Sequence, residues 1–317
     1  MGTLVEKRGD EAAVAGAIDA ACRELGFFSV VGHGIDSRLV ERVDAFAREF
    51  FALPEEEKRS IEMARGGRAW RGWFPLGGEL TSGRPDRKEG IYFGAELDPT
   101  DPRVADGRPL HGPNLFPPRP VGFREAVLEY MSALTDLGHG LARGVALALG
   151  IDPTWFREHV TDDPVVLFRI FRYPPDLQRG NESWGVAEHT DYGLLTLLHQ
   201  DGPGLEVRSG DRWLAVPPVD DAFVCNLGDM LELMSGGRYR STPHRVRNES
   251  GRDRLSLPFF FDPSWDARVR PLPGTPADPV PRDRWDARDL FAFRGTYGEY
   301  LVDKVARVFP DLGRPSR

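Results

Sequence analysis

Cysteine, lysine and long apolar runs are all scarce in this chain of 317 residues. It has only two cysteines, Cys22 and Cys225, so neither a disulfide framework nor a cysteine-rich metal site is available. The longest apolar stretches, at 165–171 and 194–198, are far shorter than the roughly 18 to 20 residues that span a bilayer. The sequence therefore excludes proteins that depend on disulfides or on a transmembrane helix.

Basic residues are outnumbered by acidic ones. The chain has 41 Lys and Arg against 49 Asp and Glu, a net charge of -8, which argues against the basic surface that nucleic-acid binding requires. The first residues, MGTLVE, turn charged without an apolar segment. We therefore expect a cytoplasmic protein, with a monomer favoured, that binds a small molecule and neither nucleic acid nor membrane.

Apolar residues with helical spacing predict a helical first half. Helices are predicted at 10–25, 37–54, 121–149 and about 286–308, with a strand at 27–31. Ser37 is the expected N-cap of the second helix, and Gly150 the residue that ends the third. Residues 66–118 are rich in Gly, Pro and aromatics without a sustained period, which predicts a long loop of the kind that is often functional.

Beyond residue 164, short runs of β-branched and aromatic residues alternate with turn signals. Strands are predicted at 165–172, 184–189, 193–199, 204–208, 212–216, 222–227, 243–247 and 254–261. Eight strands with this spacing favour a jelly roll. Asn226, Gly228 and Asp229 should form a turn into a short helix at 230–234, with Asp229 as its N-cap.

The expected fold class is therefore α+β, a jelly-roll core with an N-terminal helical scaffold and a C-terminal helix packed on the barrel. Residues 1–120 would form the helical and loop region. Residues 121–317 would form the jelly-roll region with its supporting helices, and the two would make one structural unit.

One histidine and one carboxylate stand two residues apart, at His189 and Asp191. In an extended segment both point to the same face, so that one metal ion could contact both. His244 lies in a later predicted strand of the same barrel. Two imidazoles and one carboxylate are the ligand set that iron(II) oxygenases prefer, because it leaves three adjacent positions open for a chelating cosubstrate and O2.

Arg254 and Ser256 form a second pair with strand spacing. An arginine can bind a carboxylate through two parallel hydrogen bonds, and a neighbouring hydroxyl adds a third. This pair suits the distal carboxylate of 2-oxoglutarate, and the phenol of Tyr173 could donate to the same group. The alternative is a surface salt-bridge arginine and a core tyrosine.

Six segments that include these residues carry a family resemblance. They are 26–35 (GFFSVVGHGI), 86–94 (DRKEGIYFG), 189–198 (HTDYGLLTLL), 226–230 (NLGDM), 241–246 (STPHRV) and 254–256 (RLS). In this order they resemble the isopenicillin N synthase-like branch of the 2-oxoglutarate- and iron(II)-dependent oxygenases, over about residues 14–305. The resemblance implies a distorted double-stranded β-helix. It also implies iron on His189, Asp191 and His244, which are then the catalytic residues, and a cosubstrate clamp of Arg254, Ser256 and Tyr173.

The resemblance also implies the reaction. 2-Oxoglutarate and O2 would be consumed, giving succinate and CO2, and a small molecule would be hydroxylated, desaturated or cyclised. We expect a specialised metabolite or amino-acid derivative as substrate, and stimulation by ascorbate. Many members carry Asn two residues before the clamp tyrosine, where this chain has Phe171, which puts that contact with the cosubstrate in doubt.

The predicted substrate residues come from the long loop and the C-terminal helix, since these cover the barrel mouth in the family. They are Arg71, Trp73, Tyr92, Phe291 and Arg294. Two other functions stay open: an iron oxidase of the same fold that uses no 2-oxoglutarate, and a non-catalytic barrel that binds a small molecule.

Overall fold

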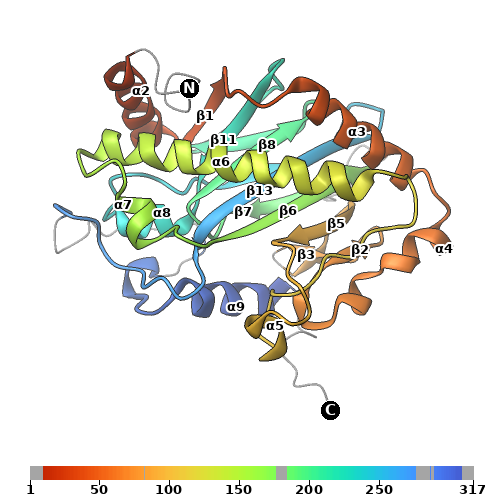
Figure 1. Cartoon of the computed structure of the whole chain (residues 1–317). Coiled ribbons are helices and arrows are strands. Elements are labelled where there is room, and N and C mark those ends of the chain that lie inside the picture. The colour runs from red at the N-terminus through yellow and green to blue at the C-terminus, as the bar shows by residue number, and fades with distance from the viewer. Residues whose placement is uncertain (1–9, 82, 176–183, 276–285, 287–288, 309–317) are drawn as a thin grey trace.

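The computed structural model describes residues 10–81, 83–175, 184–275, 286 and 289–308. A seven-stranded and a four-stranded antiparallel sheet form its centre (Figure 1). The larger sheet runs in the order β1 (Phe27–Val31), β11 (Ala222–Leu227), β8 (Leu195–Gln200), β13 (Arg254–Ser264), β6 (Pro164–Tyr173), β5 (Glu89–Gly94) and β2 (Gly72–Phe74). The smaller sheet is β10 (Arg212–Ala215), β9 (Leu205–Ser209), β12 (His244–Val246) and β7 (Val186–His189). A short hairpin of β3 (Leu80–Thr81) and β4 (Arg84–Pro85) stands apart.

All eight strands predicted beyond residue 164 are present, each within about three residues of its expected bounds. Strands β1, β2 and β5 come from the first 120 residues and extend the larger sheet by pairing with β11 and β6. The α+β jelly-roll fold class is therefore confirmed. The division at residue 120 stays a prediction.

The helices of the described residues lie outside the sheets. They are α2 (Glu11–Glu24), α3 (Ser37–Phe51), α4 (Glu55–Lys58), α5 (Pro102–Ala105), α6 (Phe123–Leu149), α7 (Trp155–His159), α8 (Asp229–Met234) and α9 (Tyr297–Val308), with 3-10 turns at η1 (Arg59–Ile61), η2 (Met63–Ala69) and η3 (Leu290–Ala292). None of them combines the length and apolar character that crossing a membrane requires.

Helix α6 lies across the outer face of the larger sheet (Figure 1). Its Tyr130 ring is 5.2 Å from that of Phe168 on β6, and its His139 ring is 4.9 Å from that of Phe261 on β13. The helix ends at Gly150, which adopts the left-handed φ of 74° as the sequence predicted. Helices α2 and α3 pack on α6 in turn, so the N-terminal scaffold covers the sheet through α6.

Two helix starts differ from the sequence prediction. Asp36, not Ser37, caps α3, because its carboxylate accepts from the Arg38 N–H at 2.9 Å. The last helix begins at Tyr297 rather than near residue 286, since the chain at Gly295 and Tyr297 hydrogen-bonds to residues 267–269 before it turns helical. Helix α9 nevertheless lies below the barrel, as expected (Figure 1).

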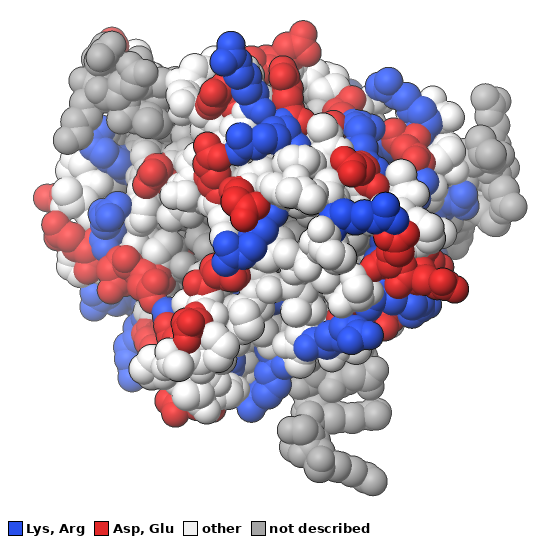
Figure 2. All heavy atoms as spheres, turned by 45° about the vertical axis from the view of Figure 1, so that its right-hand side comes forward, with Lys and Arg blue, Asp and Glu red and all other residues white. Residues whose placement is uncertain are grey.

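The surface of the described residues carries both signs of charge. On the face shown in Figure 2, basic and acidic side chains are interspersed. Charged side chains of the described residues also form ion pairs, such as Arg48 with Asp44 at 2.7 Å and with Asp201 at 2.6 Å. Charge on this face is therefore mixed, and the basic side chains do not gather in one patch.

The contact between α6 and β13 gives a prediction for two glycines. A Cβ on Gly138 would lie 2.5 Å from the Phe261 ring, whereas a Cβ on Gly16 in α2 would meet nothing within 4 Å. Gly138→Ala should destabilise the protein by about 1–3 kcal/mol through overpacking. Gly16→Ala should stabilise it by about 0.5–1 kcal/mol through helix propensity. Urea unfolding of both variants tests this, and a stabilised Gly138→Ala would show that α6 does not pack on β13 this closely.

Candidate metal centre and its cavity

Three side chains that could hold a metal ion meet at the edge of the smaller sheet. His189 ends β7 and His244 begins β12, and the two residues are directly opposite each other in the antiparallel pair. The Nε2 atoms of His189 and His244 lie 3.9 and 3.7 Å from Asp191 Oδ1. One ligand atom from each of the three residues lies within 4.8 Å of the others.

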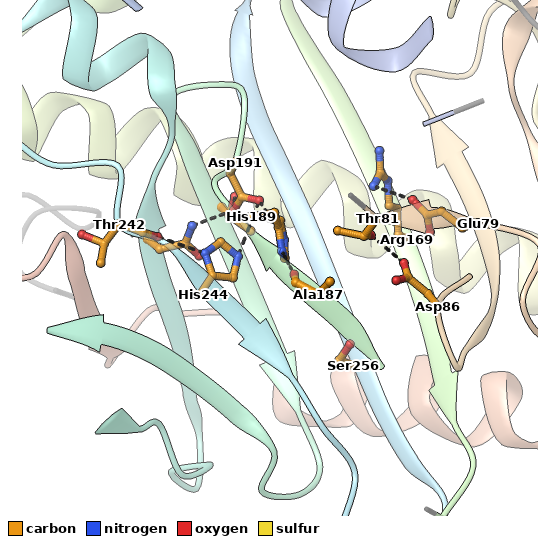
Figure 3. A network of polar contacts seen from close by, with 12 residues as sticks. Glu79, Thr81, Asp86, Arg169, Ala187, His189, Asp191, Thr242, His244 and Ser256 are labelled. Atoms are coloured by element: carbon orange, nitrogen blue, oxygen red, sulfur yellow. Dashed lines mark hydrogen bonds and ion pairs between the residues drawn. The ribbon is translucent and has the colours of Figure 1, made fainter. Parts of the chain in front are cut away.

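Backbone carbonyls orient both imidazoles. His189 Nδ1 is 2.8 Å from the Ala187 oxygen, and His244 Nδ1 is 3.2 Å from the Thr242 oxygen (Figure 3). A proton on each Nδ1 leaves the Nε2 lone pairs facing the centre, as metal ligands require. Burial, followed by the proximity of His244, lowers the pKa of His189 to about 4, so this ring is neutral at pH 7.

Asp191 is fixed by two side chains that the sequence analysis did not assign. Its Oδ2 accepts hydrogen bonds from Thr196 Oγ1 at 2.5 Å and from Asn226 Nδ2 at 2.6 Å. Burial opposes ionisation of Asp191, but the two histidines and these two donors lower its pKa below the usual value. Oδ1 is left for a metal. Asn226, read from the sequence as part of a turn, is thus a support of the metal site.

The triad opens into a cavity of about 270 Å³ between the two sheets. Two imidazoles and one carboxylate, directed into a cavity with room for further ligands, fit the donor set and open positions that iron(II) in an oxygenase needs. The donor set lacks the soft thiolate ligands that zinc and copper sites often use. The residues present therefore fit Fe(II).

Arg254 lines the same cavity and is 1% exposed. Its Nε donates to the Gly202 oxygen at 3.1 Å and its Nη2 to Gln200 Oε1 at 2.7 Å. Its Nη1 is buried and has no hydrogen-bond partner among the described residues. The hydroxyls of Ser256 and Tyr173 are beside it, 3.3 Å from each other. The structure thus brings together all three residues that the sequence placed in a clamp.

Comparison with known proteins agrees with this geometry. The profile described as non-haem dioxygenase in morphine synthesis N-terminal matches residues 1–119, and that of the 2OG-Fe(II) oxygenase superfamily matches residues 163–263. A Dictyostelium discoideum protein named probable iron/ascorbate oxidoreductase is 44% identical over 93% of this chain and 88% of its own. This chain belongs to the 2-oxoglutarate- and Fe(II)-dependent oxygenases.

Two further relatives show the breadth of the family. A homoarginine-6-hydroxylase of Arabidopsis thaliana is 39% identical, over 92% of this oxygenase and 88% of the relative. A full-length Neurospora crassa protein, crystallised in complex with alpha-KG and thymine, is 25% identical, with a TM-score of 0.81 over 97% of this oxygenase and 95% of that chain. The oxygenase is thus an enzyme that uses Fe(II) and 2-oxoglutarate.

Phe171 stands where many members of the family have Asn, and it lies on the cavity wall. It is opposite Ser256 in the sheet, and its ring centroid is 6.2 Å from that of Tyr173. The ammonium of Lys88 lies 4.7 Å from the Phe171 ring centroid. An aromatic ring under a buried cation thus takes the place of the amide.

The five predicted substrate residues are not among the described residues that line the cavity. Trp73 points to the other face of the sheet, where its Nε1 donates to Glu89 at 3.0 Å. Arg71 is buried away from the cavity and donates to the Leu110 oxygen at 2.7 Å. The sequence interpreted residues 66–118 as a loop, which has no alternation from which the direction of a side chain could be predicted. A role of these residues in substrate binding stays a prediction.

The other three lie behind or outside the wall. Tyr92 is on the inner face of β5, but its hydroxyl donates to Glu79 and its ring is covered by Arg169. Arg294 is exposed and donates to the Phe291 oxygen, within its own turn. Helix α9 does reach the cavity, through a different set of residues: Leu301, Lys304 and Val305.

Asp229 connects the segment that contains the ligand Asp191 to helix α9. The sequence had predicted Asp229 as the N-cap of the short helix at 230–234 instead. Gly228 holds the N-cap position of α8, and Asp229 is the first residue of the helix. Asp229 is fully buried, and its Oδ2 accepts from Tyr300 at 2.7 Å and Lys304 at 3.2 Å. Its backbone N–H donates to the Asp191 oxygen at 2.8 Å. One residue thus holds both the ligand loop and the C-terminal helix.

Asp262 lies at the far end of the cavity wall and is 3% exposed. Its Oδ2 accepts from the Tyr297 hydroxyl at 2.5 Å. A Cβ at position 193 would lie only 1.4 Å from its Oδ1, which explains the glycine two residues after Asp191. Burial raises the pKa of Asp262 to about 7.

This raised pKa gives a prediction for stability. The unfolded pKa is about 3.9, so the folded state binds the proton more tightly and loses stability as pH rises from about 4 through 7. Asp262→Asn cannot ionise. Its stability relative to wild type should therefore be greater at pH 8.5 than at pH 5, by about 2–3 kcal/mol. Urea unfolding at both pH values measures the difference.

Asp211→Asn, an exposed turn position, is the control for this experiment and should show no such change. An Asp262→Asn difference that is equal at the two pH values would contradict the raised pKa.

Proposed function

We propose that this oxygenase holds Fe(II) on His189, Asp191 and His244 and the C5 carboxylate of 2-oxoglutarate on Arg254, Ser256 and Tyr173. The observation that carries this assignment is the Nη1 of Arg254, a buried donor without a partner among the described residues, in the same cavity as the triad. A buried cation with an unused donor is costly unless a ligand supplies charge and acceptor. A carboxylate supplies both.

The surroundings of Arg254 prepare it for this role. Gln200 and Gly202 use two of its N–H groups and fix the guanidinium plane, so little side-chain entropy is lost when a ligand binds. Burial raises the pKa of Tyr173, which keeps its phenol protonated and able to donate. The Ser256 hydroxyl is the third donor.

The reaction follows from the family's cofactors. Bound Fe(II) supplies the redox chemistry that couples oxidative decarboxylation of 2-oxoglutarate, to succinate and CO2, to the oxidation of a substrate by O2. The chain's own residues position the ligands. His189, Asp191 and His244 would hold the metal, and Arg254 would fix the cosubstrate beside it in the same cavity.

We further propose that the substrate is a small amino-acid derivative or a related carboxylic acid. A cavity of about 270 Å³ suits a molecule of that size, and its wall contains the charged residues Glu79, Lys88, Arg169 and Lys304. The relative named homoarginine-6-hydroxylase acts on an amino acid. Hydroxylation is the outcome that this relative favours over desaturation or cyclisation.

A cytoplasmic monomer stimulated by ascorbate remains part of the proposal. Both cysteines are buried free thiols, which agrees with a reducing compartment. The relative named as an iron/ascorbate oxidoreductase supports the role of ascorbate.

The test is succinate formation from 2-oxoglutarate. Protein reconstituted with Fe(II) without oxygen is exposed to air, and wild type is compared with Asp191→Ala and His244→Ala. Turnover without substrate should give succinate in the wild type only. Oxygen uptake without succinate would favour the iron oxidase that uses no 2-oxoglutarate, and ligand binding without oxygen uptake would favour a non-catalytic barrel.

Arg254→Ala tests the clamp itself. Loss of a buried charge pair costs roughly 2–5 kcal/mol, so the affinity for 2-oxoglutarate should fall about 30- to several-thousand-fold. Arg252→Ala, two residues earlier and exposed, is the matched control and should bind normally. An unchanged affinity in Arg254→Ala would show that the clamp is elsewhere.

A further inference from the structure

A second guanidinium lines the cavity and has no role in the metal site or the clamp. Arg169 lies on β6 with 18% of its side chain exposed. Its Nε is buried without a partner, and none of its N–H groups hydrogen-bonds to a described residue. Its closest ion-pair contact, Nη1 to Glu79 Oε1, is 3.9 Å, too long for a hydrogen bond.

Aromatic rings cover Arg169 from the strands on either side of β6. Its Cζ lies 4.2 Å from the ring centroid of Tyr92 on β5 and 4.8 Å from that of Phe260 on β13. Such contacts stabilise the cation without using its hydrogen bonds. The N–H groups at the edge of the guanidinium are therefore left for a ligand.

Nearby carboxylates balance the charge of Arg169, but its N–H groups lack hydrogen-bond acceptors among the described residues. Lys88 bridges two carboxylates, Glu79 at 2.8 Å and Asp86 at 2.6 Å. Arg169 is the second cation of this group, so two acids face two bases. Coulomb balance explains why the charge can be buried. It does not explain the buried Nε–H without an acceptor, since an unpaired buried donor costs about 1–3 kcal/mol.

Arg169 lies far enough from the clamp to serve a different ligand. It is four residues before Tyr173 on the same face of β6, a separation of about 13 Å along a strand. Phe171 lies between them. In Figure 3, Arg169 and Glu79 stand across the cavity from the His189, Asp191 and His244 group.

We propose that Arg169 binds a carboxylate of the substrate, placing the rest of that molecule beside the metal. A planar carboxylate can accept two parallel hydrogen bonds from the guanidinium edge. The cavity then has two arginines for two acids, Arg254 for the cosubstrate and Arg169 for the molecule to be oxidised. This inference rests on the proposed function, because it requires 2-oxoglutarate at Arg254.

The test uses full-length protein loaded without oxygen with Fe(II) and 2-oxoglutarate. Its visible absorption band is titrated with L-homoarginine, L-arginine, L-lysine, benzoate and hexanoate, each paired with its primary amide. At least one acid should perturb the band of the wild type, and its amide should bind about 30-fold more weakly or worse.

Three variants complete the experiment. Arg169→Gln should weaken binding of the acid about 30-fold or more and should have little effect on the amide, because both changes remove the same contact. Arg169→Lys keeps the charge but loses the two parallel N–H groups. Its affinity for the acid should lie between those of the wild type and Arg169→Gln. Arg172→Gln is the matched control, since Arg172 points to the other face of β6 and pairs with Glu89 and Asp253.

The outcomes separate the two proposals. The visible absorption band with Fe(II) and 2-oxoglutarate should still appear in Arg169→Gln, which would show that the fold and the metal site are intact. The inference is wrong if no acid binds the wild type, if acids and amides bind alike, or if Arg169→Gln binds the acid as wild type does. Absence of the 2-oxoglutarate band from the wild type would overturn the proposed function, and this inference with it.

Discussion

The register of β13 between β6 and β8 is the constraint on which the site depends. Alternate residues of β13 face the cavity, and Arg254 and Ser256 are opposite Tyr173 and Phe171 on β6. Because side chains alternate in a strand, a slip of one residue would turn the clamp arginine to the outer face. The packing of Phe261 against α6 on that outer face fixes the register, so the helical scaffold determines what the inside of the barrel can bind.

Buried charges join the other segments to this barrel. Every lysine among the described residues is buried and ion-paired: Lys58 with Glu89, Lys88 with Glu79 and Asp86, and Lys304 with Asp229. Such pairs are costly to desolvate and contribute little net stability, but removal of one partner is strongly unfavourable. They therefore fix the loop of residues 79–88 and helix α9 in one position against the cavity, which is what a site for two small ligands requires.

Strand alternation and local motifs predicted the metal triad and the cosubstrate clamp from the sequence. In a strand, residues two apart point to the same face. The pair His189 and Asp191 and the pair Arg254 and Ser256 could therefore be placed from the sequence, and His244 from its position in another predicted strand. Thr196 and Asn226 were missed because their contact with Asp191 depends on the pairing of β8 with β11, which no local pattern encodes. Arg169 was also missed, because it lies within residues 165–171, which the sequence analysis interpreted as an apolar stretch. The direction of Arg71, Trp73 and Tyr92 could not be predicted, because the sequence of residues 66–118 has no sustained period.

The most direct measurement is a crystal structure of the protein with Mn(II) and 2-oxoglutarate, grown without oxygen. We predict the metal on His189, Asp191 and His244, with the distal carboxylate on Arg254, Ser256 and Tyr173 and with Arg169 free of the cosubstrate. A distal carboxylate on Arg169, or a metal bound without 2-oxoglutarate at high concentration, would contradict it.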